Sequence, residues 1–155
     1  DPYNSVPWNN RGCIHIRERH LPEAVADLRQ ALALRATDPH YHNNLGVALQ
    51  LSGDVDSALI AYGCALRIDS EAANFYSNRG FAHHLNGDLE AALRDLDRAI
   101  KLRPDYTKAY YQRAHVRAQL GDKAGAEADF HKYAELIVSE EGGVAPDNGP
   151  TIVAR

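Results

Sequence analysis

The chain has no methionine, two cysteines and no long apolar run among its 155 residues. The spacing of Cys13 and Cys64 forms neither a redox pair nor a zinc motif, so we expect two unlinked thiols. No apolar run approaches the roughly 18 residues of a membrane-spanning helix, which predicts no membrane insertion. A signal peptide is also missing, which favours a cytoplasmic protein. A leader removed from a precursor would also be compatible with a chain that begins at Asp1.

The chain also lacks an excess of positive charge. Its 17 Lys and Arg residues face 21 Asp and Glu residues, which gives a formal net charge of −4. Because nucleic-acid binding depends on Lys and Arg contacts to phosphates, this balance argues against a nucleic-acid partner. A content of 25% charged and 45% hydrophobic residues is ordinary for a folded soluble domain.

What the chain does contain is an internal repeat. Gly12, Gly46 and Gly80 are separated by 34 residues each, and Ala114 follows at the same interval. The same interval relates three further columns, which are Ala24, Ala58, Ala92 and Ala126, then Leu28, Tyr62, Leu96 and Phe130, and then Gly53, Gly87 and Gly121. A fixed period of this length indicates a stacked-repeat architecture.

Each copy has the pattern of two helices joined by a tight turn. In the second copy, the turn Gly53-Asp54 combines a glycine that ends one helix with an aspartate that caps the next. The first copy has Arg19-His20 at this place. We expect helices of about 13 residues, with the third copy restarting near Asp69-Ser70.

The period and its columns resemble the tetratricopeptide repeat. The matching residues are Trp8, Gly12, Ala24, Leu28 and Ala31 in the first copy, Leu45, Gly46, Ala58, Tyr62 and Ala65 in the second, Tyr76, Gly80, Ala92, Leu96, Ala99 and Pro104 in the third, and Tyr110, Ala114, Ala126 and Phe130 in the fourth. The resemblance implies repeats at 5–38, 39–72, 73–106 and 107–140, with an irregular tail at 141–155. The implied fold is all-α, an α-solenoid of four stacked antiparallel helix pairs in a right-handed superhelix.

The resemblance also implies that the first helix of each pair lines a concave groove. The residue two positions before each repeat glycine would face that groove, and here it is Asn10, Asn44, Asn78 and, before Ala114, Gln112. Because a side-chain amide offers both a donor and an acceptor, such a column matches an extended peptide backbone. The alternative is that these amides join neighbouring repeats.

Apolar side chains occupy the centre of this expected groove. Val47 and Phe81 lie one helical turn from the amide column and would select an apolar side chain of the ligand. The candidate peptide-binding set is Asn10, Asn44, Val47, Asn74, Asn78, Phe81, Lys108, Tyr111, Gln112 and His115. The chain does not reproduce the paired cations with which some family members bind a chaperone's C-terminal carboxylate, so we expect a different ligand.

The sequence shows no catalytic set and no metal or cofactor motif. His83 and His84 diverge on a helix, and His84 and His115 could approach each other across the groove without a Cys or acidic partner. We therefore predict a non-enzymatic module that binds a protein or peptide partner. The alternative is a self-assembling scaffold, a homo-oligomer formed through the tail or through the outer face of the first pair around Val6 and Trp8.

Overall fold

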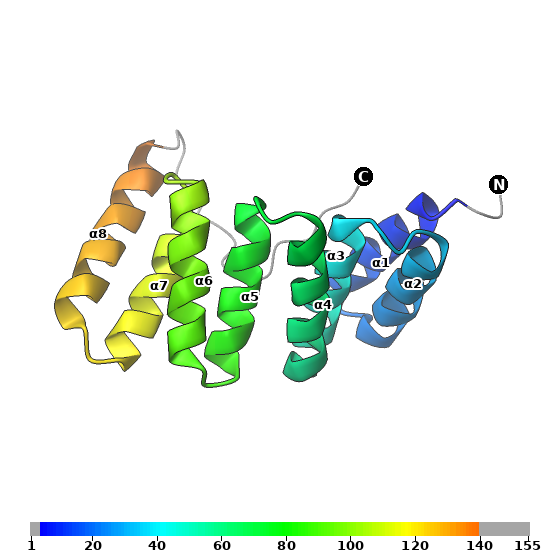
Figure 1. Cartoon of the computed structure of the whole chain (residues 1–155), viewed down its shortest axis with the longest axis horizontal. Coiled ribbons are helices and arrows are strands. Elements are labelled where there is room, and N and C mark those ends of the chain that lie inside the picture. Colours follow the sequence, from blue (N-terminus) through cyan, green and yellow to red (C-terminus); the bar gives the residue numbers. More distant parts are fainter. Residues whose placement is uncertain (1–3, 140–155) are drawn as a thin grey trace. The chain divides into compact units, whose positions relative to one another are not determined.

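The computed structural model describes residues 4–139, and within them the chain is entirely helical (Figure 1). The helices are α1 (Val6–Arg17), α2 (Leu21–Leu34), α3 (Pro39–Leu51), α4 (Val55–Ile68), α5 (Ala73–Leu85), α6 (Leu89–Leu102), α7 (Thr107–Gln119) and α8 (Lys123–Ser139). The predicted all-α class built from helix pairs is confirmed. The predicted tail at 141–155 lies outside the described residues. None of the helices in 4–139 has the length and apolar character that crossing a bilayer requires.

The helices divide into two compact units between Glu71 and Ala72. In the first unit, α1 pairs with α2 and α3 pairs with α4, while α3 also packs against α2 and α1. The second unit repeats this plan, because α7 packs against its partner α8 and also against α6 and α5. Each unit therefore buries apolar surface both within a pair and between consecutive pairs, as a stacked repeat requires.

The turns inside the pairs follow the predicted chemistry in three of four cases. Gly53, Gly87 and Gly121 have φ values of 88°, 80° and 84°, and the aspartate after each glycine accepts a hydrogen bond from a backbone N–H of the next helix. In the first pair, Arg19 takes the same left-handed conformation with φ 64°, and the His20 side chain makes no capping bond. A non-glycine residue is uncommon in this region, so this turn differs chemically from the others.

One predicted helix start was wrong. The third pair begins at Ala73 rather than near Asp69-Ser70. The carboxylate of Asp69 accepts a hydrogen bond from the backbone N–H of Glu71 at 3.0 Å. This local Asx-type contact closes a turn in place of the first helical turn, which is a common use of aspartate.

The repeat glycines allow close contact between the two helices of a pair. A Cβ atom added at Gly12 would lie 2.8 Å from Cγ of Leu28, and one added at Gly46 would lie 2.6 Å from Cε1 of Tyr62. Real Cβ atoms do not approach other carbon atoms this closely. Leu28 and Tyr62 are fully buried, so the glycine column allows the two helices of a pair to pack closely.

An ion pair with a buried carboxylate joins the helices in three of the four pairs. It links Arg11 to Asp27, Arg79 to Asp95 and Arg113 to Asp129, in each case through two hydrogen bonds of 2.6 to 2.8 Å. The carboxylates are buried, whereas the side chains of Arg11, Arg79 and Arg113 are 55%, 28% and 14% exposed. The second pair has Leu45 and Ala61 at the corresponding places.

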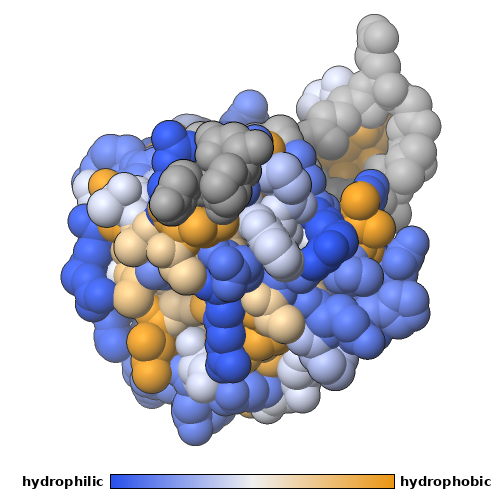
Figure 2. All heavy atoms as spheres, turned by 90° about the vertical axis from the view of Figure 1, so that its right-hand side faces the viewer, coloured by the Kyte–Doolittle hydropathy of each residue, from blue (hydrophilic) through white to orange (hydrophobic). Residues whose placement is uncertain are grey.

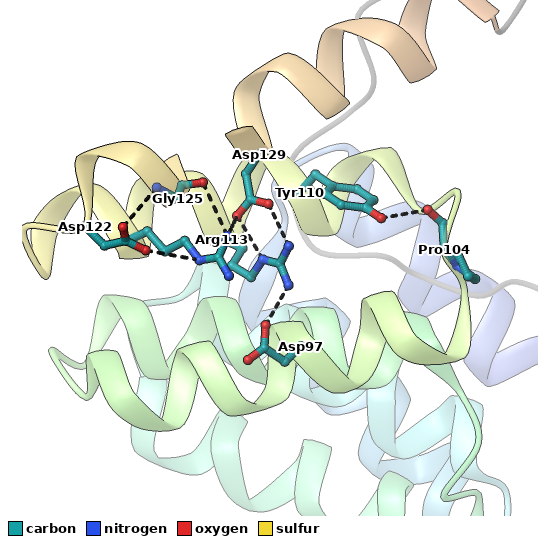
Figure 3. A network of polar contacts seen from close by, with 8 residues as sticks. Asp97, Pro104, Tyr110, Arg113, Asp122, Gly125 and Asp129 are labelled. Carbon is teal, nitrogen blue, oxygen red and sulfur yellow. Dashed lines mark hydrogen bonds and ion pairs between the residues drawn. The ribbon is translucent and has the colours of Figure 1, made fainter. Parts of the chain in front are cut away.

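The last of these ion pairs belongs to a larger network around α7 (Figure 3). Arg113 also donates to Asp97 of α6 at 2.6 Å, and Arg117 donates to Asp129 at 2.9 Å. The Tyr110 hydroxyl donates to the carbonyl of Pro104 at 2.9 Å. These contacts fix α7 against α6 and α8, and α7 carries most of the candidate site.

Candidate functional site

A pocket of about 290 Å³ lies in the second unit between side chains of α5 and α7. Phe81 and His84 line it from α5, and Tyr111, Gln112 and His115 line it from α7. Four of these five residues, all except His84, belong to the set predicted from the sequence. Residues spaced by three or four positions share one face of a helix, which explains why α5 and α7 each contribute a cluster.

Aromatic rings from α7 and α8 support the pocket wall. The rings of Tyr111 and His115 lie 4.6 Å apart in an edge-to-face arrangement, and His115 meets Phe130 in the same way at 5.2 Å. Tyr133 lies 5.1 Å from Tyr111. Such contacts are favourable beyond the area they bury, so α8 holds the lining rings in a preferred geometry.

Gln112 gives the pocket an unused hydrogen-bond donor. Its side-chain oxygen accepts a hydrogen bond of 2.6 Å from the Ser77 hydroxyl, and the residue is only 3% exposed. Its amide nitrogen is buried and has no hydrogen-bond partner within residues 4–139. A buried donor without an acceptor is costly, by about 1–3 kcal/mol, and an acceptor on a bound molecule would remove that cost.

The other amides of the predicted column are already bonded inside the units. Asn44 is fully buried and donates to Oδ1 of Asn9 at 2.9 Å, which joins the second pair to the first. Asn78 is also fully buried, and its oxygen accepts a hydrogen bond from Nζ of Lys108 at 3.2 Å, which joins the fourth pair to the third. These contacts correspond to the alternative interpretation of the column as a joint between repeats. Binding of a peptide by these two amides stays a prediction.

Sequence comparison agrees with this geometry. A family model described as "TPR repeat" matches residues 20–53 and 84–121, and one described as "Tetratricopeptide repeat" matches residues 107–137. The chain belongs to the tetratricopeptide repeat (TPR) family. No curated protein matches the sequence. The family matches confirm the resemblance that the sequence shows. TPR proteins are in general protein-interaction modules.

Solved TPR structures share the fold at low sequence identity. A MamA fragment from Desulfovibrio magneticus RS-1 is 20% identical, with a TM-score of 0.81 over 90% of this chain and 79% of that one. The first TPR of Spaghetti (RPAP3), bound to the HSP90 peptide SRMEEVD, is 19% identical, with a TM-score of 0.74 over 78% and 96%. YrrB, described as a TPR protein with an unusual peptide-binding site, is 17% identical, with a TM-score of 0.75 over 88% and 70%.

The remaining predicted residues of this TPR chain lie at different depths. Val47 is 1% exposed and Lys108 is 4% exposed, so both are buried. Asn10 and Asn74 are half-buried, and the oxygen of Asn10 accepts a hydrogen bond from Asn9 at 3.4 Å. Asn10 and Asn74 are therefore the two members of the predicted amide set that keep part of their surface open to a ligand.

His84 is the pocket residue that the predicted set left out. The pKa of His84 lies below the ordinary value of 6.5, mainly because the ring is partly buried. A hydrogen bond with Gln119 raises this pKa, and the neighbouring His115 lowers it. The ring is therefore neutral at pH 7, and it meets Phe81 edge-to-face at 6.2 Å. The spacing of three residues from Phe81 is the sequence signal that points to it.

Proposed function

We propose that this chain is a non-enzymatic interaction module that binds an extended peptide or a partner helix. The ligand places one aromatic or apolar side chain in the pocket between Phe81 and Tyr111. The observation that carries the proposal is an aromatic-lined pocket with one unused buried donor. A volume of about 290 Å³ is at the lower end of ligand pockets, which suits a single side chain.

The chemistry of the lining defines the preferred ligand. The rings of Phe81, His84 and Tyr111 offer faces and edges to an apolar or aromatic group. The amide nitrogen of Gln112 donates to a carbonyl or hydroxyl oxygen of the same ligand residue. A ligand that fills the pocket but lacks this acceptor leaves the donor unsatisfied and binds less tightly.

The amide side chains of the predicted peptide-binding set have two roles in this proposal. The buried amides of Asn44 and Asn78 each hold two consecutive pairs together inside their own unit, and Lys108 takes part in the contact of Asn78. Asn74, which is half-buried on the same helix as Phe81, contacts the backbone of the ligand, while Asn10 offers a half-buried amide in the first unit. Val47 belongs to the buried support.

The peptide-binding structures among the similar TPR chains support the class of ligand. One has an HSP90 peptide bound, and another is described as having an unusual peptide-binding site. This chain does not carry the paired cations that bind a chaperone's terminal carboxylate, and Lys108, on the same helix as three of the pocket residues, is buried against Asn78. We therefore expect a ligand that is recognised by an internal apolar residue rather than by its C-terminus.

The test is selection from a displayed random-peptide library, followed by affinity measurement on Phe81→Ala and Gln112→Met. Methionine is close to Gln112 in volume but removes its donor, and with it the oxygen that accepts the hydrogen bond of Ser77. We expect selected peptides to share one aromatic or large apolar position, and each variant to lose at least tenfold in affinity with unchanged helical content. Ile60→Ala, at a side chain of α4 that is 70% exposed, is the matched control and should bind as the wild type does. Peptides without a shared apolar position, or equal affinity in all variants, would refute the proposal.

A second candidate function is self-association through the α1–α2 end. Figure 2 looks onto this end and shows apolar patches between hydrophilic side chains. Ile14 of α1 is 42% exposed, and Trp8 is half-buried under the guanidinium of Arg11 at 4.7 Å. Sedimentation velocity of the wild type and of Ile14→Lys distinguishes the two functions. A concentration-dependent mass that the variant abolishes supports assembly, and a monomer in both leaves the peptide-binding function alone.

A further inference from the structure

The turn between α1 and α2 brings together three side chains with metal-binding atoms. His15 lies near the end of α1, Glu18 follows that helix, and His20 precedes α2. One ligand atom from each lies within 4.8 Å of the others. Nδ1 of His20 is 3.4 Å from a carboxylate oxygen of Glu18, and the two imidazole rings are 5.9 Å apart. The backbone N–H of His20 donates to the carbonyl of His15 at 2.9 Å, which fixes the two ends of the turn.

His15 is oriented as a metal ligand would be. Its Nε2 atom faces the carboxylate of Asp27 at 3.7 Å. This distance is longer than a hydrogen bond, but a carboxylate on this side of the ring is the usual partner of a metal-bound histidine, whose other nitrogen then binds the ion. The other nitrogen, Nδ1, is buried and has no hydrogen-bond partner in residues 4–139. Arg11 donates two hydrogen bonds to Asp27, so the carboxylate is fixed in place.

The turns inside the other three helix pairs lack these three side chains. The residues that correspond by repeat position to His15, Glu18 and His20 are Leu49, Ser52 and Asp54, then His83, Asn86 and Asp88, and then Arg117, Leu120 and Asp122. The three aspartates are engaged as helix caps. The His20 side chain makes no capping bond, so the substitution of histidine for the cap aspartate is not explained by capping.

We propose that His15, Glu18 and His20 form a binding site for a divalent transition-metal ion such as Zn²⁺. Imidazole nitrogens and a carboxylate oxygen suit this class of ion, and they bind it at about 2.0–2.2 Å. Ligand atoms of a tetrahedral site then lie about 3.4 Å apart. The side chains of Glu18 and His20 are 55% and 59% exposed, so they can turn by the small distance needed to close on the ion.

Three protein ligands leave one tetrahedral position for water or for a ligand from another molecule. The turn also carries the cationic side chain of Arg19, and Arg17 precedes it. These charges oppose a cation, so the affinity is lower than that of a closed structural zinc site. The site lies in the first unit and does not depend on the peptide-binding function proposed for the second.

Isothermal titration of the full chain with Zn²⁺ tests the site. Three variants each remove one ligand, namely His15→Leu, Glu18→Gln and His20→Asn. Leucine is the residue that the second copy has in place of His15, and asparagine keeps a capping side chain at position 20. His131→Gln is the control, because His131 is an exposed histidine whose neighbour Glu135 belongs to the same helix.

We expect one Zn²⁺ site in the wild type and in His131→Gln, and at least a tenfold loss of affinity in each ligand variant. The imidazole NMR signals of His15 and His20 should shift on Zn²⁺ addition, while those of the other six histidines stay. No binding by the wild type overturns the proposal, and so does unchanged affinity in Glu18→Gln and His20→Asn. Circular dichroism checks that each variant is folded. If His15→Leu does not fold, the other two variants decide.

Discussion

The buried ion pair between Arg79 and Asp95 makes a specific prediction, because the chain contains its own apolar version. The second pair has Leu45 and Ala61 where the third has Arg79 and Asp95. We expect Asp95→Ala to destabilise the protein strongly. We also expect the double variant Arg79→Leu with Asp95→Ala to recover most of the lost stability.

The magnitude follows from the contacts. Asp95→Ala removes two charge-assisted hydrogen bonds of 2.7 and 2.8 Å and leaves the guanidinium without its buried partner. Breaking a buried pair in this way costs about 3–5 kcal/mol. Because the Arg79 side chain is 28% exposed, water replaces part of the lost interaction, and we expect about 2–4 kcal/mol. Replacing both partners by apolar residues leaves no buried charge, so the double variant should lie within about 1 kcal/mol of the wild type.

Urea denaturation at pH 8 measures these free energies of unfolding. At this pH His83, which lies 4.0 Å from Asp95, stays neutral and does not contribute. The four proteins of the double-mutant cycle should share one m-value, since a changed m-value would signal loss of cooperative unfolding. If the double variant loses the sum of the two single losses, Arg79 and Asp95 are not coupled and the reasoning is wrong.

Three further predictions concern packing, pH and capping. Gly46→Ala should cost about 1–3 kcal/mol in urea denaturation, because the added methyl would lie 2.6 Å from the Tyr62 ring. Burial lowers the pKa of His83 below its ordinary 6.5, so the unfolded chain binds the proton more readily and stability should fall as pH drops through about 6.5. Thermal melts from pH 8 to 5 should show this loss, and it should be smaller in His83→Leu. The hydrogen bonds of Ser57 lower the pKa of Asp54, so this cap stabilises the protein above the ordinary pKa of aspartate and is lost in acid. Asp54→Asn should flatten the acid limb of the melting profile.

The fold could be predicted because it depends on local and periodic signals. The glycine and alanine columns indicate close packing between the two helices of a pair. The turn at Gly53-Asp54 indicates the end of one helix and the cap of the next. The start of α5 was missed because Asp69 can either cap a helix or close a turn. Sequence alone does not decide which backbone N–H its carboxylate will accept.

The structure brings Phe81, Tyr111, Gln112 and His115 of the predicted set to one pocket, and binding of a peptide there stays a prediction. Phe81 was singled out because it lies one helical turn from Asn78. The depth of the amides was not predictable, since Asn44 is equally suited to bind a ligand or a neighbouring repeat. The ion pairs between residues 16 apart were missed as well. Residues 16 apart lie on the two different helices of a helix pair. Only the packing of these two helices brings Arg79 next to Asp95.

The thiol of Cys13 lies at the joint between the first two pairs. Asn44 donates to its sulfur at 3.4 Å, and burial raises its pKa to about 11, opposed by the nearby charge of Arg17. An alkylating reagent therefore reaches a reactive thiolate only when that joint opens. Cys64 on α4 is half-buried and serves as an internal reference. The alkylation rate of Cys13 relative to that of Cys64 therefore follows how often this joint opens, so the protein carries its own probe of how easily neighbouring repeats separate while the rest stays folded.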